Sequence, residues 1–246
     1  MAGFDTAGTI QEVESAAMSE FSKTAFWLRY FSPCPYTAVN SSSTNANDEC
    51  AAAYESGAPY LGPITSPTQS RLSGTEADGT ADANTFTNAL YTVYVDVGPL
   101  VLPTNNELWC WLDQEYSTSL SVDYWNGWSN GVASYNFADT GTYPLLPSLY
   151  CDPCAPYPNC STLLDATYPC YGIWSSEPEP CGDTENPPTW DGDTCSGCGV
   201  DNGVNTNMWQ YGEQTVCGYS ADVDLDLGHP SLVVADYCFY ISSNPN

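Results

Sequence analysis

The sequence predicts one α/β domain with an irregular TIM-like (β/α) barrel, and three observations support this. Short apolar runs of strand type alternate with segments of helical periodicity, which is typical of a parallel sheet, open or closed. The length of 246 residues fits a single barrel, because barrels of roughly 250 residues form one domain. The 12 cysteines, an even number, indicate disulfide-stapled loops and an oxidising compartment.

The strand candidates are short runs rich in apolar, aromatic or β-branched residues. In chain order they are residues 3–5, 25–31, 59–65, 107–113, 145–150, 171–175, 207–211, 222–227 and 235–242. Residues 107–113 (ELWCWLD) form the clearest central strand. We interpret residues 235–242 as a strand or tail that holds down the C-terminus.

Helical segments lie between several of these strands. Ile10, Val13, Ala17 and Phe21 repeat at helical spacing, as do Val122, Trp125 and Val132. Residues 45–56 are predicted as a helix, which begins with polar capping residues and ends at Gly57. Residues 80–97 begin as a helix of open extent, because their second half (LYTVYVDV) has a β-rich composition.

Residues 151–203 differ from the rest of the chain, because they are rich in Pro, Gly, Asp and Cys and show little periodicity. We interpret them as elaborated loops held by disulfides around one strand. No internal repeat or second domain is evident, so the prediction is one domain over residues 1–246.

The charge balance excludes several classes of partner. The chain has 30 acidic and 3 basic residues, for a net charge of −27. Nucleic acid and anionic membrane surfaces are therefore not expected partners, since no basic patch could displace counterions from phosphates. No run of about 20 apolar residues that could span a membrane is present. We expect a secreted, extracellular protein whose export signal lies outside this sequence.

Acidic residues mark the ends of several predicted strands. Asp5 ends the first strand, Asp113 ends the central one, and Asp224 lies in the last predicted barrel strand. Glu115 follows Asp113 by two positions, so both side chains are expected on one face. In a barrel the carboxyl ends of the strands converge on the active site. Crowded carboxylates raise one another's pKa, which supplies the proton donor that glycosidic cleavage requires.

Aromatic residues near these acids suit a sugar ring. Trp111 precedes Asp113 on the central strand, and Trp209 and Tyr211 share a later strand. Arg29 ends the second predicted strand, where it could pair with a site carboxylate or form a purely structural salt bridge. These four residues are the candidates for substrate binding.

Six short motifs occur in the order found in one family of glycosidases. They are Gly3-Phe4-Asp5-Thr6, Arg29-Tyr30, Gly79-Thr80-Ala81-Asp82-Ala83, Leu112-Asp113-Gln114-Glu115, Trp209-Gln210-Tyr211, and Gly218 ahead of Val223-Asp224-Leu225. On these motifs the chain resembles the family 25 glycoside hydrolases, the lysozyme-like muramidases. It is also similar to the related glycoside-hydrolase-like barrels of poorly known function. Residues 151–203 and the cysteines match the family poorly.

The resemblance implies roles for the acidic residues. Glu115 would be the general acid, and Asp113 would assist it or position the N-acetyl group of the substrate. Asp5 and Asp224 would shape the electrostatics of the site. The implied activity is hydrolysis of an amino-sugar polysaccharide such as peptidoglycan, with a glycan as partner and no cofactor or metal. Against this, the net charge of −27 disfavours approach to anionic cell walls at low salt.

A second hypothesis is that the chain folds as the same barrel but has little or no catalytic activity. A weakly active or inactive barrel could serve as an extracellular structural, self-assembling or sugar-binding protein. Its many Tyr, Thr, Ser and Cys residues and its elaborated loops suit a durable extracellular component. An open groove with aromatic walls around Asp113 and Glu115 would favour the enzyme, whereas a groove plugged by loops would favour the scaffold.

Three other patterns compete for a function. Cys151-x-x-Cys154 and Cys195-x-x-Cys198 have zinc-knuckle spacing, although disulfides suit a secreted chain better. An acidic loop at residues 191–201 could hold calcium but lacks the spacing of a known calcium loop. His229 is the only histidine and has no nucleophile motif to serve, so it is interpreted as a loop residue.

Overall fold

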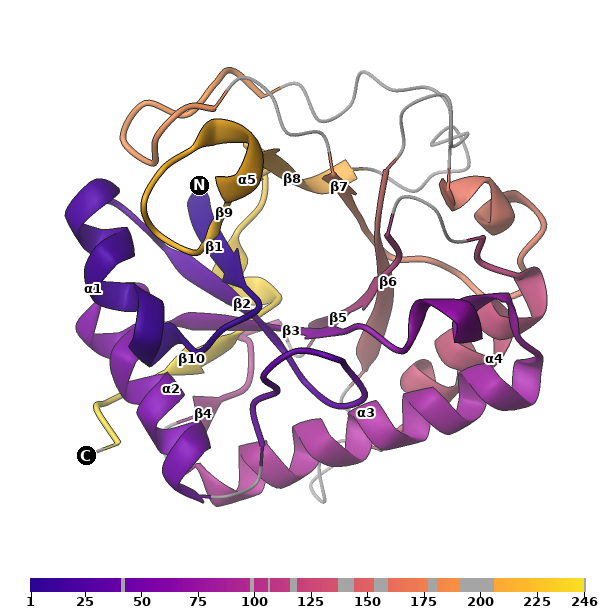
Figure 1. Ribbon diagram of the computed structural model, residues 1–246. Helices are drawn as coiled ribbons and strands as arrows, with labels where there is room; N and C mark the ends of the chain where they lie inside the picture. The colour runs from indigo at the N-terminus through magenta and orange to yellow at the C-terminus, as the bar shows by residue number, and fades with distance from the viewer. Residues whose placement is uncertain are drawn as a thin grey trace.

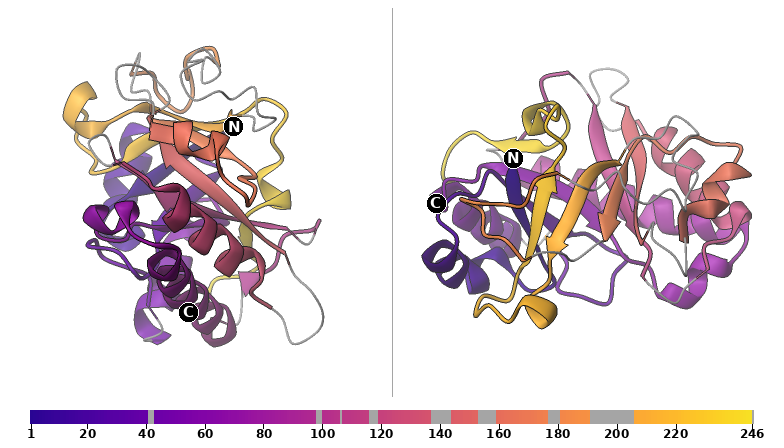
Figure 2. Two further views of the ribbon diagram at one scale, coloured as in Figure 1. Left: turned by 90° about the vertical axis from the view of Figure 1, so that its right-hand side faces the viewer. Right: turned by 90° about the horizontal axis from the view of Figure 1, so that it is seen from above.

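The computed structural model describes residues 1–40, 43–97, 100–105, 107–115, 119–136, 144–152, 159–176, 181–190 and 206–245. Within them, eight strands close a barrel, and helices α1 to α4 lie around its outside (Figures 1 and 2). The predicted TIM-like barrel is therefore confirmed. Over the same residues, no helix has the length and apolar character needed to cross a bilayer.

The elements follow the predicted alternation. The barrel strands are β1 (Ala2–Thr6), β2 (Phe26–Tyr30), β3 (Tyr60–Thr65), β5 (Leu108–Asp113), β6 (Leu145–Cys151), β7 (Ile173–Ser176), β8 (Thr206–Gly212) and β9 (Asp224–Gly228). Two short strands, β4 (Leu100–Val101) and β10 (Phe239–Ile241), extend the sheet beside β3. The helices are α1 (Ile10–Glu20), α2 (Ser43–Glu55), α3 (Glu76–Asp96), α4 (Val122–Ala133) and the short α5 (Gln214–Cys217). The 3₁₀ turns are η1 (Gln69–Ser73), η2 (Asn159–Leu164) and η5 (Val234–Asp236).

One strand departs from the predicted parallel sheet. Strands β1, β2, β3, β5, β6, β7 and β8 are parallel neighbours, but β9 is antiparallel to both β8 and β1. A parallel crossover needs a dozen or more residues, usually including a substantial helix. The connection from β8 to β9 is residues 213–223 and holds only the short α5, so the chain turns back instead. The start of β9 therefore lies at the same end of the barrel as the carboxyl ends of the parallel strands.

The barrel interior is filled by aromatic side chains below that end. Trp111 packs edge-on against Trp174 at a centroid distance of 6.1 Å and against Trp109 at 5.4 Å. Trp109 stacks at 4.1 Å on Tyr237, which follows η5. The segment after β9 thus closes one end of the barrel, and the tryptophans separate that closure from the opposite, open end.

Helix α3 is longer than the composition of its second half predicted. It runs unbroken through residues 90–96 (LYTVYVD), because Leu90 and Val93 are buried in the core and tertiary packing overrides β propensity. Its first half lies very close to α4. A Cβ on Gly79 would come within 2.1 Å of the Tyr124 carbonyl oxygen, and one on Gly127 within 1.9 Å of the Glu76 carbonyl oxygen. These glycines permit the close crossing of the two helices.

Among the described residues, some cysteines form disulfides and others are free thiols. A disulfide joins Cys181, in the irregular region, to Cys217 in α5, and Cys160 is also disulfide-bonded. Cys34, Cys50, Cys110, Cys170 and Cys238 are free thiols, so disulfides do not engage every cysteine. The predicted alternatives at Cys154, Cys195, Cys198 and residues 191–201 lie outside the described residues. Cys151 is buried at the end of β6.

Arg29 forms a fully buried ion pair on the outside of the barrel. Its Nε and Nη2 donate to the two carboxylate oxygens of Glu49 in α2, at 3.1 and 2.8 Å. Its Nη1 and Nη2 also donate to the carbonyl oxygens of Thr6 and Thr37. Both side chains are at most 1% exposed. The Arg29 side chain therefore ties β2 to α2, to the end of β1 and to the loop after β2, which is the structural one of the two roles considered for Arg29.

Removing one partner of this pair should be strongly destabilising. Arg29→Met leaves the buried Glu49 carboxylate without its cation, which costs about 3–5 kcal/mol in comparable cases. The double variant Arg29→Met/Glu49→Leu should recover most of that loss. Urea unfolding followed by tryptophan fluorescence measures both. Arg71→Met is the control, because Arg71 is 42% exposed in its pair with Asp82 and should matter less. An Arg29→Met loss no larger than that of the control would contradict the assignment.

Candidate active site

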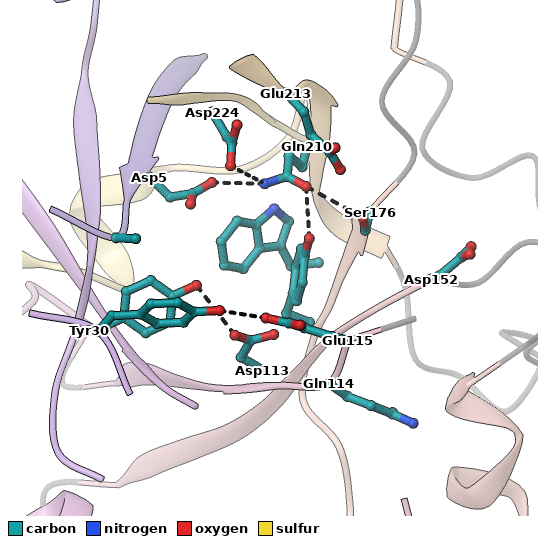
Figure 3. Close-up of a pocket in the computed structure, with 14 residues that line it drawn as sticks. Asp5, Tyr30, Asp113, Gln114, Glu115, Asp152, Ser176, Gln210, Glu213 and Asp224 are labelled. Atoms are coloured by element: carbon teal, nitrogen blue, oxygen red, sulfur yellow. Dashed lines mark hydrogen bonds between the residues drawn. The ribbon is translucent and has the colours of Figure 1, made fainter. Parts of the chain in front are cut away.

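The open end of the barrel holds a pocket of about 330 Å³. Its walls come from the ends of β1, β2, β5, β6, β7 and β8 and from the start of β9. The lining residues are Asp5, Ala7, Tyr30, Tyr36, Asp113, Gln114, Glu115, Tyr150, Asp152, Trp174, Ser176, Gln210, Glu213 and Asp224. Four aromatic side chains and six carboxyl groups are among them (Figure 3). Among the described residues this is an open, aromatic-walled site.

Asp113 and Glu115 both line this pocket, but in different environments. The Tyr30 hydroxyl donates to Asp113 Oδ2 at 3.3 Å, and Asp113 is 1% exposed. The Tyr36 hydroxyl donates to Glu115 Oε1 at 2.6 Å, and Glu115 is exposed (Figure 3). One carboxyl group is thus embedded in the wall and the other is accessible to a ligand.

Gln69 in η1 holds the backbone of this motif. Its amide nitrogen donates to the Asp113 carbonyl oxygen at 3.3 Å, and its amide oxygen accepts from the Glu115 backbone nitrogen at 3.1 Å. The Gln114 backbone nitrogen donates to the Tyr150 carbonyl oxygen at 3.0 Å, which continues the pairing of β5 with β6. The strand geometry therefore persists just past the end of β5, so that residues 113 and 115 stay on one side.

Burial changes the protonation of Asp113. Loss of solvent raises its pKa to about 7, and the neighbouring Glu115 carboxylate contributes to the increase. Its Oδ1 is buried without a hydrogen-bond partner. Asp113 can therefore give up or take a proton near neutral pH.

A second carboxyl cluster faces this pair across the pocket. Gln210 on β8 donates from Nε2 to Asp5 Oδ2 at 3.1 Å and to Asp224 Oδ2 at 3.4 Å. Its Oε1 accepts from the Tyr150 hydroxyl at 2.8 Å and from Ser176 Oγ at 3.4 Å. Asp5 and Asp224 are directly opposite each other on antiparallel strands. Burial raises the pKa of Asp224 to about 6.

Asp226 lies beneath this cluster and is fully buried. Its Oδ1 accepts a hydrogen bond from Trp174 Nε1 at 2.9 Å, while its Oδ2 is buried without a hydrogen-bond partner. Burial raises the pKa of both Asp5 and Asp226. Repulsion from Asp224 adds to the increase at each, and repulsion from Asp5 adds to the increase at Asp226. The neutral forms of Asp5 and Asp226 are therefore favoured.

The predicted substrate-binding residues lie elsewhere. Trp111 faces the barrel interior but is fully buried below the pocket. Trp209 and Tyr211 point to the outer face of β8, where Trp209 contacts Trp190. Arg29 is engaged by Glu49, as described above. None of the four lines the pocket.

Three pocket residues whose side chains hydrogen-bond the predicted carboxyl groups were not themselves candidates from the sequence. Tyr30 and Gln210 lie one position from the candidates Arg29 and Trp209, on the opposite faces of β2 and β8. Tyr36 comes from the loop after β2 and shows no sequence signal that we can name. For Gln210 a signal did exist, since it is the one polar residue in the run MWQY.

No Lys, Arg or His is among the residues that line the pocket. His229 contacts Trp190 and Ser231 outside it. Within the described ranges, no group of three or more His, Cys, Asp or Glu side chains could hold a metal ion.

The fold is shared with solved structures at low sequence identity. No family model and no curated protein matches the chain. An uncharacterised protein of B. stearothermophilus aligns with 96% of this chain and 100% of its own, at 19% identity and a TM-score of 0.65. The spore cortex lytic enzyme SleM of Clostridium perfringens aligns over 94% of this chain and 68% of its own, at 15% identity and a TM-score of 0.54.

A third similar structure is GHIP of Streptococcus pneumoniae, described as a glycosyl hydrolase 25 and a virulence factor in host cell invasion. It aligns over 95% of this chain and 89% of its own, at 12% identity and a TM-score of 0.51. At these identities the likeness shows the fold alone. The chain thus has a barrel of the kind found in family 25 glycoside hydrolases.

The buried carboxyl groups should make the protein more stable in acid. Because the pKa of Asp113 is raised to about 7 and that of Asp224 to about 6, the native state binds more protons than the unfolded chain above pH 4. Stability should therefore fall as pH rises from about 4 to about 7. Thermal unfolding across this range should show the highest Tm at its acidic end.

Asp113→Asn should flatten this dependence, since it removes one of the groups responsible. Asp96→Asn is the matched control, because Asp96 is exposed at the end of α3 and should leave the slope unchanged. A Tm that falls steadily from pH 7 to pH 4, or an equal effect of the two variants, would contradict this account.

Proposed function

We propose that this protein is an extracellular glycoside hydrolase that cleaves an amino-sugar polysaccharide. The observation that carries the proposal is the pairing of Asp113 and Glu115 in one open pocket, with unequal burial. Such a pair supports acid catalysis by carboxyl groups, because different environments separate their roles. The aromatic walls of Tyr30, Tyr36 and Trp174 suit the apolar face of a sugar ring.

Glu115 is the general acid in this proposal. Its exposed carboxyl group protonates the glycosidic oxygen, the bond from that oxygen to C1 breaks, and positive charge develops at C1. The Tyr36 hydroxyl keeps its proton, because burial and the hydrogen bond to Glu115 raise the pKa of Tyr36. It therefore remains a donor that stabilises the Glu115 carboxylate after proton transfer. A water molecule then adds at C1 and returns a proton to Glu115.

Asp113 positions the substrate and takes part in proton movement. Its partner-free Oδ1 is available to the N-acetyl group of an amino sugar, whose carbonyl oxygen can attack C1 while Asp113 accepts a hydrogen bond from the amide. Asp5 and Asp224 face the same pocket from the other side. The carboxylate form of Asp224 favours the cationic transition state.

Glu115→Gln should abolish hydrolysis while leaving the fold intact. Loss of a general acid lowers the rate by about 10²–10⁴-fold. Release of reducing ends from peptidoglycan and from chitin-type polymers, measured from pH 3 to pH 7, gives the activity, and circular dichroism and Tm report the fold. Glu55→Gln is the control, because Glu55 is exposed at the end of α2 and bonds only Asn244 among the contacts described. Full activity of the Glu115→Gln variant would contradict the proposal.

The same assay addresses the sugar-binding alternative. If the wild-type protein binds an amino-sugar polymer but releases no reducing ends over the whole pH range, the barrel is a binding protein. Self-association into particles or filaments without turnover would favour the structural role.

A further inference from the structure

The connection from β8 to β9 is fastened near its start by a disulfide and near its end by a helix. The disulfide joins Cys217, the last residue of α5, to Cys181. At the other end, the Glu20 carboxylate of α1 accepts hydrogen bonds from the backbone nitrogens of Ser220 at 2.9 Å and Ala221 at 3.2 Å. The two fastenings are independent, so one can be released while the other holds.

Helix α5 depends on its disulfide more than a longer helix would. It has four residues, and helices this short are not stable by themselves in water. Its turn is closed by hydrogen bonds from Cys217 N to the Glu213 carbonyl oxygen at 2.8 Å and from Gly218 N to the Gln214 carbonyl oxygen at 2.9 Å. Within the described contacts, no side chain caps its first turn. The covalent bond at Cys217 therefore holds this turn in place.

The same turn forms part of the wall of the candidate active site. Glu213, directly before α5, lines the pocket. The Gln214 backbone nitrogen donates to Asp224 Oδ1 at 3.0 Å. In Figure 3, Glu213 and Asp224 lie on the same side of the pocket as Gln210. One helical turn thus separates the disulfide from a carboxyl group of the site.

The opposite end of the disulfide belongs to a segment that is anchored on the outside of the barrel. In residues 181–190, Thr184 Oγ1 accepts from the Lys23 backbone nitrogen at 3.2 Å. Trp190 packs edge-on against Trp209 of β8 at a centroid distance of 6.1 Å. The disulfide therefore attaches the α5 turn to a segment with contacts of its own.

This disulfide is accessible to a reductant, because Cys181 is an exposed residue. Thiol–disulfide exchange needs access of a thiolate to one sulfur. A dithiol attacks Cys181 Sγ, the bond to Cys217 breaks, and the Cys217 thiolate takes up a proton. The second thiol of the reductant then displaces Cys181 as a thiol. The protein gains two thiols, and the dithiol is oxidised to its own disulfide.

We infer that the Cys181–Cys217 disulfide is a redox-sensitive clamp on the pocket. When oxidised, it holds α5 so that Glu213 and Asp224 keep their places in the wall. When a dithiol reduces it, α5 loosens and the hydrogen bond from Gln214 to Asp224 is lost, while α1 still holds the far end of the connection. As a control of hydrolysis the clamp rests on the proposed function, but as a control of the pocket wall it does not.

Hydrogen exchange at assigned backbone amides tests the clamp. Reduction with dithiothreitol should lower the protection of the Gln214 amide by about tenfold or more. The Ala221 amide, which Glu20 binds, and the amides of β5 should keep their protection. Unchanged protection of Gln214 would overturn the inference. Equal losses at Gln214, Ala221 and β5 would also overturn it, because the disulfide would then be a general staple of the fold.

A double variant separates this disulfide from the other cysteines. Cys181→Ser/Cys217→Ser should reproduce the reduced state without a reductant. Added dithiothreitol should cause no further loss at the Gln214 amide, although it also reaches the disulfide of Cys160. Cys170→Ser is the control and should leave that amide protected, because Cys170 is a partly buried free thiol. A further loss in the double variant, or an equal loss in the control, would contradict the clamp.

Hydrolysis distinguishes this inference from the proposed function. Activity on peptidoglycan and chitin-type polymers is measured before reduction, after reduction and after reoxidation. A loss of about tenfold or more that reoxidation reverses supports both. Selective loss of protection at Gln214 without hydrolysis in either state supports the clamp and contradicts the glycosidase. Hydrolysis at the same rate in both states leaves the glycosidase intact and overturns the clamp as a control of the pocket.

Discussion

The hydrogen bonds of β9 to both of its neighbours hold the site together. By pairing antiparallel with β1 and with β8, this strand closes the barrel and brings Asp224 opposite Asp5. Without that closure, Asp5 would lie at one edge of an open sheet and Gln210 at the other. The short connection before β9 forces the reversal, and the reversal places the start of β9, where Asp224 lies, at the end of the barrel where the parallel strands finish.

Closure also determines the electrostatics. The ring of strands excludes water from carboxyl groups that would otherwise be solvated, and loss of solvent is the largest cause of the raised pKa of Asp113, Asp224 and Asp226. The aromatic layer of Trp111 and Trp174 below them keeps the interior dry. Gln210 and Tyr30 donate hydrogen bonds to some of the carboxyl oxygens in the pocket. These bonds and the raised pKa of the carboxyl groups allow the acids to lie close together. A reserve of protons in a sugar-sized pocket is a physical basis for acid catalysis.

The solved barrels share the fold of this chain, and at such low identity the likeness extends to no single residue of the site. SleM and GHIP share the architecture at 15% and 12% identity, and the residues of the pocket have to be argued from this chain alone. In this chain, the pocket is lined by acidic residues and by no basic residue. Its net charge of −27 extends the negative sign over the whole molecule. The long-range field and the pocket lining therefore both disfavour a negatively charged ligand.

The sequence by itself determined the alternation of strands and helices, the placement of acids at strand ends and the order of the family-like motifs. Spacing alone predicted Asp113 and Glu115 for one face, because the side-chain period of a strand is two. On the remaining strands, only the tertiary structure decided which side chains point into the barrel. The sequence indicated Arg29 and Trp209 for substrate binding, whereas Tyr30 and Gln210 are the residues that point into the pocket. Strands buried on both faces carry no amphipathic signal, and a shift of one residue exchanges the inner and outer faces. The direction of β9 and the placement of Asp224 opposite Asp5 likewise depend on closure, which joins residues more than 200 positions apart.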